Sequence, residues 1–403
     1  MDSVLLKNAR LVGASDDSSP VSLLIVNGRF VETFTEDKNI AGATTIDAAG
    51  LRLLPGFIDV HNHGAVGVDV NVADTDGLLE IGAYLAKNGV TAWLPTLVPD
   101  SDENYVRVIA AIDKLMAIQS DKPVAQALGV HYEGVFASEK MCGALRPQYF
   151  RKFRDSSSDL VVSEDAGTTK PREITQNGVM SLPTLKKGVH MTTLAPEVEG
   201  SIDLIRELCR RDWIVSIGHT RADTETLNDA FAAGARHMTH FFNAMTGLHH
   251  REVGVAGWGL ANKEVTFDMI ADGIHVHPQM LEFACRTKSP EKVSLISDSV
   301  APTGLGDGSY QLWGETITVE KGRTRNERGS IAGSVITMLD AVRQMRGLGF
   351  SDHEVSKMAA QNPAKLLGCF QERGSIEIGK RADLVGLDDE GNVKFTMIGG
   401  KVV

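Results

Sequence analysis

The sequence has few of the features that mark secreted or membrane-spanning proteins. Its 403 residues contain only four cysteines, far apart and without a CxxC spacing, so we expect them to be reduced and partly buried. No run of eighteen apolar residues could cross a bilayer, and the amino terminus lacks the basic and apolar regions of a signal peptide. These absences predict a soluble, cytoplasmic protein without a membrane partner.

Positively charged residues are also scarce relative to acidic ones. The 41 Lys and Arg residues, against 52 Asp and Glu residues, give a formal net charge of -11. Nonspecific binding to nucleic acid requires clustered basic side chains, so we expect no nucleic-acid partner, although a local basic pocket for a small anion fits this balance. The length allows two or three domains, or one large barrel with an appendage.

Short apolar runs separated by turn residues occupy both ends of the sequence. Asn27-Gly28 lies between two such runs and is typical of a tight β-hairpin. The same pattern returns near the carboxyl end, from Gly374 onward. We therefore predict a small β-sandwich domain built from residues 1–52 and 372–403, which encloses a central domain of residues 53–371.

The central part alternates apolar strands with amphipathic helical stretches. Strands are predicted at 53–60, 89–97, 125–133, 189–197, 213–219, 237–243, 265–275 and 292–298. Helices are predicted between them, at 76–87, 101–118, 201–211 and 224–233 among others. This alternation and these lengths indicate an α/β fold, a (β/α)8 TIM-type barrel.

The first central strand ends in two histidines one residue apart, His61 and His63. Residues at positions i and i+2 of a strand point to the same face, so both imidazoles aim at one point. A divalent metal requires such an arrangement. For this motif alone, the alternative is a pair of histidines that caps a core strand without any ligand.

Further residues able to bind metal end the later strands, at the edge where active sites of such barrels lie. They are Glu133, His219, His240, His275 and Asp298. Ligand sets rich in histidine are typical of Zn²⁺, with Fe²⁺, Mn²⁺ or Co²⁺ as alternatives. We therefore expect a divalent metal as the cofactor, with zinc as the first choice.

The strand from Pro55 to Gly64 resembles the opening strand of the amidohydrolase superfamily. Within that superfamily, further segments resemble the N-acetylglucosamine-6-phosphate deacetylases, and the match covers nearly the whole sequence. These segments are His131-Tyr132-Glu133-Gly134, Leu194-Ala195-Pro196-Glu197, Gly218-His219-Thr220, Thr239-His240-Phe241-Phe242-Asn243-Ala244-Met245, Ala271-Asp272-Gly273-Ile274-His275-Val276, Ser297-Asp298-Ser299 and Gly333-Ser334-Val335-Ile336-Thr337-Met338.

The resemblance implies how the metal ligands are shared. Glu133 ligates or bridges the metals, in the place that a carboxylated lysine fills in many relatives. His219 and His240 complete one metal site with it. His61 and His63 provide a second site, so the resemblance implies a binuclear centre, with one or two ions in each subunit.

The resemblance also implies the roles of the remaining residues. Asp298 is the general acid/base, which takes a proton from water and passes it to the leaving amine. His275 binds the sugar or polarises the carbonyl, and Asn243, Ala244 and Arg251 hold the phosphate of a small-molecule amino-sugar substrate. Because the arginine of this family can come from a neighbouring subunit, we expect a homodimer.

The chain departs from the family's pattern beside the expected sugar site. Leu145 occupies the place of a substrate-contacting histidine, and an apolar side chain cannot donate the lost hydrogen bond. His249, His250 and Arg146 are candidates to compensate for it. Residues 155–187 follow, and we expect an extended excursion on the active-site side or, alternatively, a surface insertion without a role.

The leading hypothesis is a metal-dependent hydrolase that converts N-acetylglucosamine 6-phosphate into glucosamine 6-phosphate and acetate. One alternative is an amidohydrolase that acts on a different N-acyl amino sugar, such as N-acetylgalactosamine 6-phosphate or an unphosphorylated sugar, or on a cyclic amide. Another is a non-catalytic barrel that acts in protein assembly, because a fold does not by itself fix a function.

Overall fold

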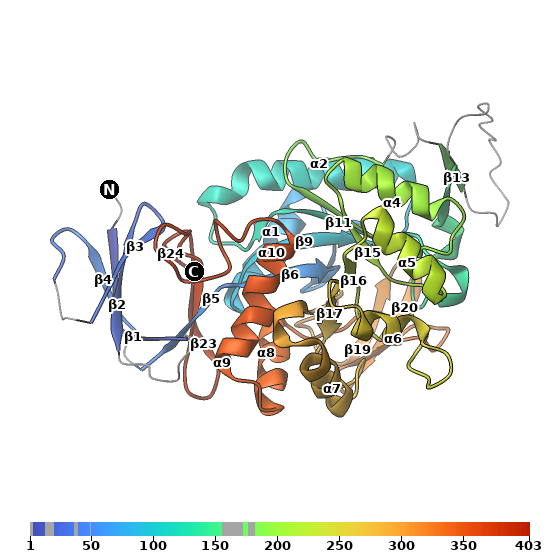
Figure 1. The fold of residues 1–403 in the computed structure, drawn as a ribbon. Helices are drawn as coiled ribbons and strands as arrows, with labels where there is room; N and C mark the ends of the chain where they lie inside the picture. Colours follow the sequence, from blue (N-terminus) through green and yellow to red (C-terminus); the bar gives the residue numbers. More distant parts are fainter. Residues whose placement is uncertain (1–2, 13–19, 36–38, 49, 155–171, 176–181) are drawn as a thin grey trace.

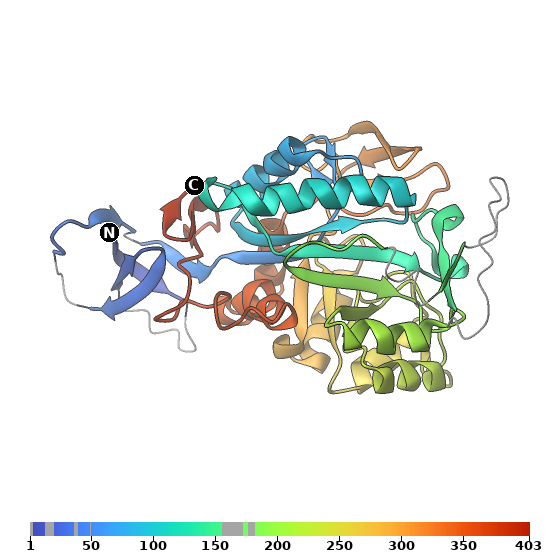
Figure 2. The ribbon, with the colours of Figure 1, turned by 90° about the horizontal axis from the view of Figure 1, so that it is seen from above.

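A large barrel and a smaller β unit make up the molecule, and both ends of the chain belong to the smaller unit (Figure 1). The computed structural model describes residues 3–12, 20–35, 39–48, 50–154, 172–175 and 182–403. Seen from above, the smaller unit lies at one end of the molecule and helices cover the outside of the barrel (Figure 2).

The smaller unit is an eight-stranded sheet that combines strands from both ends of the sequence. Its strands are β1 (Ser3–Leu11), β2 (Val21–Val26), β3 (Arg29–Phe34), β4 (Thr44–Asp47), β5 (Arg52–Pro55), β22 (Leu384–Leu387), β23 (Val393–Ile398) and β24 (Lys401–Val402). β5 pairs antiparallel with β22, so one ladder joins the two ends of the chain. The pairing of the ends agrees with the prediction, whereas the domain limits at residues 52 and 371 stay a prediction.

Eight parallel strands form a nearly closed barrel, which confirms the predicted (β/α)8 fold. In their order around the barrel they are β6 (Phe57–Asn62), β9 (Val90–Leu97), β11 (Gly129–Phe136), β14 (Val189–Leu194), β15 (Ile214–Ile217), β16 (His237–Met238), β17 (Thr266–Ile270) and β18 (Val293–Ile296). Between β18 and β6 the circle is bridged just beyond the strands, where Asp298 N donates to His61 O at 3.0 Å.

The helices agree with the sequence pattern, and the four predicted ones end within one residue of the expected positions. They are α1 (Thr75–Lys87), α2 (Asp102–Ile118), α4 (Ser201–Arg210), α5 (Thr224–Ala233), α6 (Gly254–Ala261), α7 (Pro278–Lys288), α8 (Met338–Gly347), α9 (Asp352–Ser356) and α10 (Asn362–Leu366). Asp74, Ser101 and Asp223 fix three of the starts, because each side chain accepts a hydrogen bond from a free backbone N–H of the first turn.

The predicted strand at 53–60 is two strands that belong to different sheets. Gly56 separates them: its N–H donates to Asp383 O in the terminal sheet, while the next residue, Phe57, donates to Gly89 O in the barrel. A Cβ at Gly56 would lie 2.2 Å from Thr91 Cγ2, so only glycine fits this crossing. The apolar pattern could not show the break, because both halves are buried.

The predicted strand at 237–243 is also wrong in its extent. β16 ends at Met238, because His240 (φ 34°), Phe242 (φ 77°) and Ala244 (φ 51°) adopt left-handed backbone conformations that no strand accommodates. The strand predicted at 265–275 ends at Ile270, and Gly273 (φ 70°) lies in the irregular segment that follows it.

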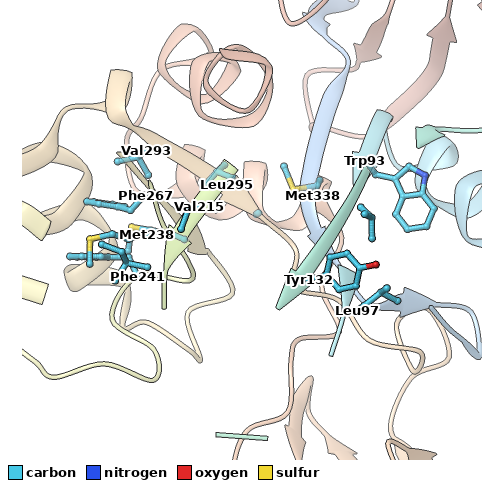
Figure 3. Packing of buried hydrophobic residues seen from close by; sticks show 14 of the residues in the cluster. Trp93, Leu97, Tyr132, Val215, Met238, Phe241, Phe267, Val293, Leu295 and Met338 are labelled. Atoms are coloured by element: carbon cyan, nitrogen blue, oxygen red, sulfur yellow. The ribbon is translucent and has the colours of Figure 1, made fainter. Parts of the chain in front are cut away.

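The main apolar core lies between the barrel strands and the surrounding helices. Phe241 and Phe267 stack with ring centroids 4.0 Å apart, beside Met238 and Val293 (Figure 3). Offset or parallel contact between aromatic rings adds to the free energy gained by their burial. This packing fixes the outer face of β16 and β17, the two strands that precede His240 and follow it.

Two smaller elements lie outside the regular barrel pattern. β19 (Gly308–Leu312), β20 (Glu315–Glu320) and β21 (Arg323–Arg325) form a three-stranded sheet between β18 and α8. β12 (Arg151–Arg154) pairs in parallel with β13 (Arg172–Thr175). Most of the predicted excursion at 155–187 lies outside the described residues. Within the described part, none of the helices combines the length and the apolar character that crossing a membrane requires.

Gly129 offers a test of how tightly the barrel strands approach each other. A Cβ at this position would lie 2.0 Å from the backbone oxygen of Val189, in the ladder between β11 and β14. We expect Gly129→Ala to lower the free energy of unfolding by about 1–3 kcal/mol, measured by urea denaturation. Gly347→Ala is the control, since a Cβ there meets nothing within 4 Å. Equal stability of the two variants would contradict the prediction.

Candidate metal centre and active site

The carboxyl ends of five barrel strands bring the predicted metal ligands and the predicted acid into one buried cluster. The strands are β6, β11, β15, β16 and β18, and each residue lies on its strand or within two residues of its end. All six residues are at most 7% exposed; they are His61, His63, Glu133, His219, His240 and Asp298. The sequence prediction of convergence at this edge of the barrel therefore agrees with the structure.

Glu133 lies at the centre of this cluster. Its Oε1 is 3.1 Å from His219 Nε2 and 3.0 Å from His240 Nε2. Its Oε2 is 3.2 Å from His63 Nε2. The carboxylate thus belongs to two groups of potential metal ligands, one with His61 and His63 and the other with His219 and His240. One residue shared by two ligand groups is the geometry that a binuclear centre requires.

The imidazole nitrogens that face one another can hold a proton or a cation between them. His61 Nε2 lies 3.0 Å from His63 Nε2, and His219 Nε2 lies 3.0 Å from His240 Nε2. A neutral imidazole whose other nitrogen carries the proton presents only a lone pair at Nε2. Lone pairs from two rings and a carboxylate that meet at one buried point fit a divalent cation such as Zn²⁺.

Backbone carbonyls fix the orientation of two of these rings. His63 Nδ1 donates to Thr96 O at 3.2 Å, and His219 Nδ1 donates to Met141 O at 2.8 Å. Each bond places the proton of the neutral ring on Nδ1 and turns the lone pair of Nε2 inward. His61 Nδ1 and His240 Nδ1 have no such partner within the described part of the chain.

In the metal-free protein, protons take the place of the cation. Burial lowers the pKa of His63, but the hydrogen bonds and negative charges of Asp298 and Glu133 outweigh it and raise that pKa to about 10. Burial likewise lowers the pKa of His240, and Glu133 raises it to about 9. Burial raises the pKa of Glu133, yet the neighbouring histidines hold it well below its usual value. The cluster therefore stabilises positive charge.

Three of the site residues have left-handed backbone conformations. The φ angles are 48° for His219, 34° for His240 and 49° for Asp298. Each such residue costs about 1–2 kcal/mol, so the surrounding hydrogen bonds must hold it. Ser334 N, for example, donates to Asp298 O at 2.7 Å. These turns direct the side chains from the strand ends toward the axis of the barrel.

A buried carboxylate ties the first strand to the segment that carries Asp298. Asp59 accepts hydrogen bonds from Ser297 Oγ at 2.5 Å and from Asn62 Nδ2 at 3.2 Å. It also accepts from the backbone N–H of His61 at 3.4 Å. Burial raises the pKa of Asp59, and these hydrogen bonds oppose the rise. The network joins the two strands that close the barrel.

The predicted substrate-binding residues divide into two sets. Asn243 and Ala244 follow β16, one of the strands that carry the cluster, and His275 follows the neighbouring strand β17. His275 Nδ1 lies 2.6 Å from Asp272 Oδ2, so the ring is held through that nitrogen. The side-chain amide of Asn243 donates to His240 O at 3.2 Å, so it supports the turn that presents His240.

Arg251 is the one predicted substrate-binding residue that lies away from the strands of the cluster. It lies in an exposed loop, and its Nη1 is 2.7 Å from His250 Nε2. The structure of the single chain therefore does not bring it to the metal cluster. His249 and His250 lie in the same exposed loop, with ring centroids 4.4 Å apart.

An apolar wall lies beside the cluster where the resemblance leads one to expect a histidine. Leu145 is 3% exposed and packs against Gly134, the residue after Glu133. Trp313 packs in the same apolar group, with its ring 5.3 Å from that of His63. Arg146 does not replace the missing donor, because its Nη2 binds Asp100 Oδ2 at 2.7 Å.

The residues that hold the backbone of the predicted ligands were not predicted from the sequence. Asp59 and Asp268 lie within apolar strands, and both side chains are fully buried. A carboxylate in such a position is costly unless it is hydrogen-bonded, and this was the available signal. Trp313 gave no comparable signal, because its place beside His63 depends on how the β19–β20 hairpin folds over the barrel.

The sequence resembles known hydrolases over its whole length. The amidohydrolase family model matches residues 52–403. The N-acetylglucosamine-6-phosphate deacetylase of Bacillus subtilis is 34% identical over 100% of this chain and 97% of its own. The N-acetylgalactosamine-6-phosphate deacetylase of Escherichia coli O157:H7 is 35% identical over 87% of each chain. A mutant N-acetyl-D-glucosamine-6-phosphate deacetylase of Mycobacterium smegmatis, solved with N-acetyl-D-glucosamine-6-phosphate, is 28% identical, with a TM-score of 0.84, over 100% of this chain and 99% of that one.

The barrel and the buried cluster of histidines and carboxylates define a hydrolase with a metal site at the carboxyl ends of its strands. The amidohydrolase family model, which matches residues 52–403, and the 34% identity to the B. subtilis relative show which family of hydrolases this is. The chain belongs to the amidohydrolase family.

The raised pKa values of His63 and His240 predict how the stability of the metal-free protein depends on pH. Both exceed the ordinary value of 6.5, so their protons stabilise the folded state fully below pH 6.5. This contribution is lost as the pH rises through about 9 and about 10. We expect the free energy of unfolding of the metal-free protein, measured by urea denaturation, to fall as the pH rises from 6.5 to about 10. Metal-loaded protein should not show the same fall. A constant value in the metal-free protein would rule this out.

Proposed function

We propose that the protein hydrolyses the amide bond of N-acetylglucosamine 6-phosphate and releases acetate and glucosamine 6-phosphate. The observation that carries this proposal is the Glu133-centred cluster with Asp298 beside it, in a chain whose relatives are named as amino-sugar-phosphate deacetylases. In the reaction, the C–N bond breaks, water oxygen bonds to the acetyl carbon, and a proton reaches the departing nitrogen.

The proposed metal ligands are His61, His63, Glu133, His219 and His240, with zinc in one or two sites. The chemistry that a metal supplies here is Lewis acidity, which polarises the amide carbonyl and acidifies the attacking water. The protein contributes the preorganised geometry: the inward lone pairs of His63 and His219 are fixed by Thr96 O and Met141 O.

Asp298 is the proposed general base and acid. Burial raises its pKa, but the charges of His61 and His63 outweigh burial and hold it below the ordinary value. The carboxylate is therefore ionised at neutral pH and can accept a proton from the attacking water. Its Oδ1 lies 3.3 Å from His63 Nε2, within the same cluster as the proposed ligands, so it is placed to pass that proton to the leaving nitrogen.

The remaining roles concern the sugar and its phosphate. His275, held by Asp272, is proposed to bind the sugar or the amide carbonyl. Asn243, Ala244 and Arg251 are proposed to bind the phosphate. Because Arg251 lies in an exposed loop and is not part of the cluster of its own chain, we propose that it acts on the substrate of a neighbouring subunit in a homodimer. The cytoplasmic location stays a prediction.

N-acetylgalactosamine 6-phosphate is a second candidate substrate. The E. coli relative named for that sugar phosphate is as similar to this chain as the B. subtilis relative named for the glucosamine derivative. The apolar wall of Leu145 and Trp313 also leaves the sugar-contacting side without the expected histidine. Comparing kcat/KM for the two epimers decides between the two substrates.

Replacing Asp298 tests the mechanism. Asp298→Asn keeps the size of the side chain but removes its ability to accept a proton, so we expect kcat for acetate release to fall by about 10²–10⁴-fold. Acetate is measured with an enzyme-coupled assay, and metal content is measured in the same samples as a control. Wild-type kcat in a variant that retains its metal would refute the assigned role.

Replacing Arg251 tests the phosphate site. We expect Arg251→Ala to lower kcat/KM for the 6-phosphate by about tenfold to a hundredfold, the effect of losing a charge-assisted hydrogen bond. The unphosphorylated N-acetyl sugar serves as the control substrate and should react at an unchanged rate. Equal losses with both substrates would contradict a phosphate role.

Mixed dimers test whether Arg251 acts across the subunit interface. If it does, subunits with Arg251→Ala and subunits with Asp298→Asn complement each other, because a mixed dimer contains one site with both residues. After exchange of subunits, we expect about a quarter of wild-type activity from two nearly inactive parents. Activity no higher than that of the parents shows that each arginine serves its own chain.

A further inference from the structure

A fully buried carboxylate of the barrel, Asp268, has no part in the proposed chemistry. It lies in the middle of β17 and is 0% exposed. One oxygen, Oδ1, accepts a hydrogen bond from the backbone N–H of His240. The other, Oδ2, lies 3.1 Å from Nε2 of His237. The backbone oxygen of Asp268 accepts from Phe241 N at 2.9 Å, so both bonds to the 240–241 segment come from one residue.

His240 depends on its backbone more than the other ligands of its group do. The ring of His219 is fixed through Nδ1 by a backbone carbonyl, whereas Nδ1 of His240 has no partner among the described residues. The backbone of His240 is left-handed, and Phe242 and Ala244 share that conformation. The direction of this ring is therefore set by how the strained turn is held.

The first strand repeats this arrangement in the other ligand group. His63 is fixed through its ring by Thr96 O, while Nδ1 of His61 has no partner within the described chain. The backbone N–H of His61 instead donates to the buried carboxylate of Asp59 at 3.4 Å. Each group thus contains one histidine held by its ring and one held by a buried aspartate at its backbone.

We propose that Asp268 is a positioning residue for metal binding and that His237 fixes its carboxylate. His237 is 1% exposed, and its Nδ1 lies 2.7 Å from Thr266 Oγ1. The chain Thr266–His237–Asp268 therefore ends on the backbone of His240. The carboxylate, held at both oxygens, keeps His240 in the left-handed conformation that points Nε2 at Glu133.

His237 lies at the amino ends of the strands, so its hydrogen bond to Asp268 can be removed without replacing a residue at the carboxyl ends. Together with Thr266, it lines a crevice of about 600 Å³ formed by residues at the amino ends of the strands. The metal ligands lie at the carboxyl ends of the same strands. A substitution at His237 therefore replaces no residue at the carboxyl-end face where the substrate is proposed to bind.

The test compares metal binding in four variants. Asp268→Ala removes the carboxylate, His237→Phe fills the space without a donor, and His237→Gln restores an N–H for Asp268 Oδ2. His190→Phe is the control, because this half-buried histidine accepts from Leu185 N, away from the cluster. Zn²⁺ affinity is measured by chelator competition, and the geometry of the site by the absorption spectrum of the Co²⁺-loaded protein.

We expect Asp268→Ala and His237→Phe to weaken Zn²⁺ binding by about tenfold to a hundredfold and to change the Co²⁺ spectrum. His237→Gln should bind within about threefold of wild type, and His190→Phe should match wild type. If Asp268→Ala does not fold, the pair at His237 still decides the outcome. Wild-type affinity and spectrum in His237→Phe, or equal losses in His237→Phe and His237→Gln, would overturn the positioning role of the hydrogen bond.

This inference rests on the proposed metal centre. Metal binding by the wild-type protein shows whether a failure concerns the centre or only the role of Asp268 and His237. Wild-type protein that binds neither Zn²⁺ nor Co²⁺ would overturn the centre and the inference together. Wild-type protein that binds metal, together with unaffected variants, would overturn only the role of Asp268 and His237.

Discussion

The carboxylate of Glu133 lies among imidazole nitrogens in a place that water hardly reaches, and this charge arrangement constrains the rest of the site. A buried carboxylate is stable only if positive charge or hydrogen-bond donors surround it. In this protein both oxygens of Glu133 face histidine nitrogens at 3.0–3.2 Å. The cluster therefore stabilises positive charge, and its two ligand groups could each hold a divalent metal.

The barrel supplies the rigidity that this arrangement requires. Parallel strands end at one edge, so residues far apart in the sequence, such as His61 and Asp298, become neighbours. The backbone bond between Asp298 N and His61 O also bridges the closure of the barrel. The hydrogen bond that closes the barrel therefore also holds His61 and Asp298 next to each other. The left-handed turns at His240 and Asp298 persist because buried hydrogen bonds hold them.

The sugar recognition that we propose is separated in the fold from the proposed chemistry. The reactive groups are carried by strand ends, whereas Leu145, Trp313 and Arg251 lie on connecting segments. Loops can change their side chains without disturbing the barrel, so specificity can vary around a fixed centre. This separation fits a family in which relatives of similar identity are named for different amino-sugar phosphates.

The sequence by itself determined the eight-stranded alternation, the pairing of the chain ends and the histidines and acids that meet in the buried cluster. These features are local: apolar runs, turn residues and a histidine or acid at several strand ends can be recognised without knowing the contacts. Tertiary structure decided the break at Gly56, the early end of β16 and the hydrogen bonds by which Asp59 and Asp268 accept from the backbone of His61 and His240. It also placed Trp313 beside His63 and left Arg251 outside the cluster of its own chain. These features depend on contacts between distant segments, and a pattern along one chain does not encode which neighbour a buried carboxylate or a loop will meet.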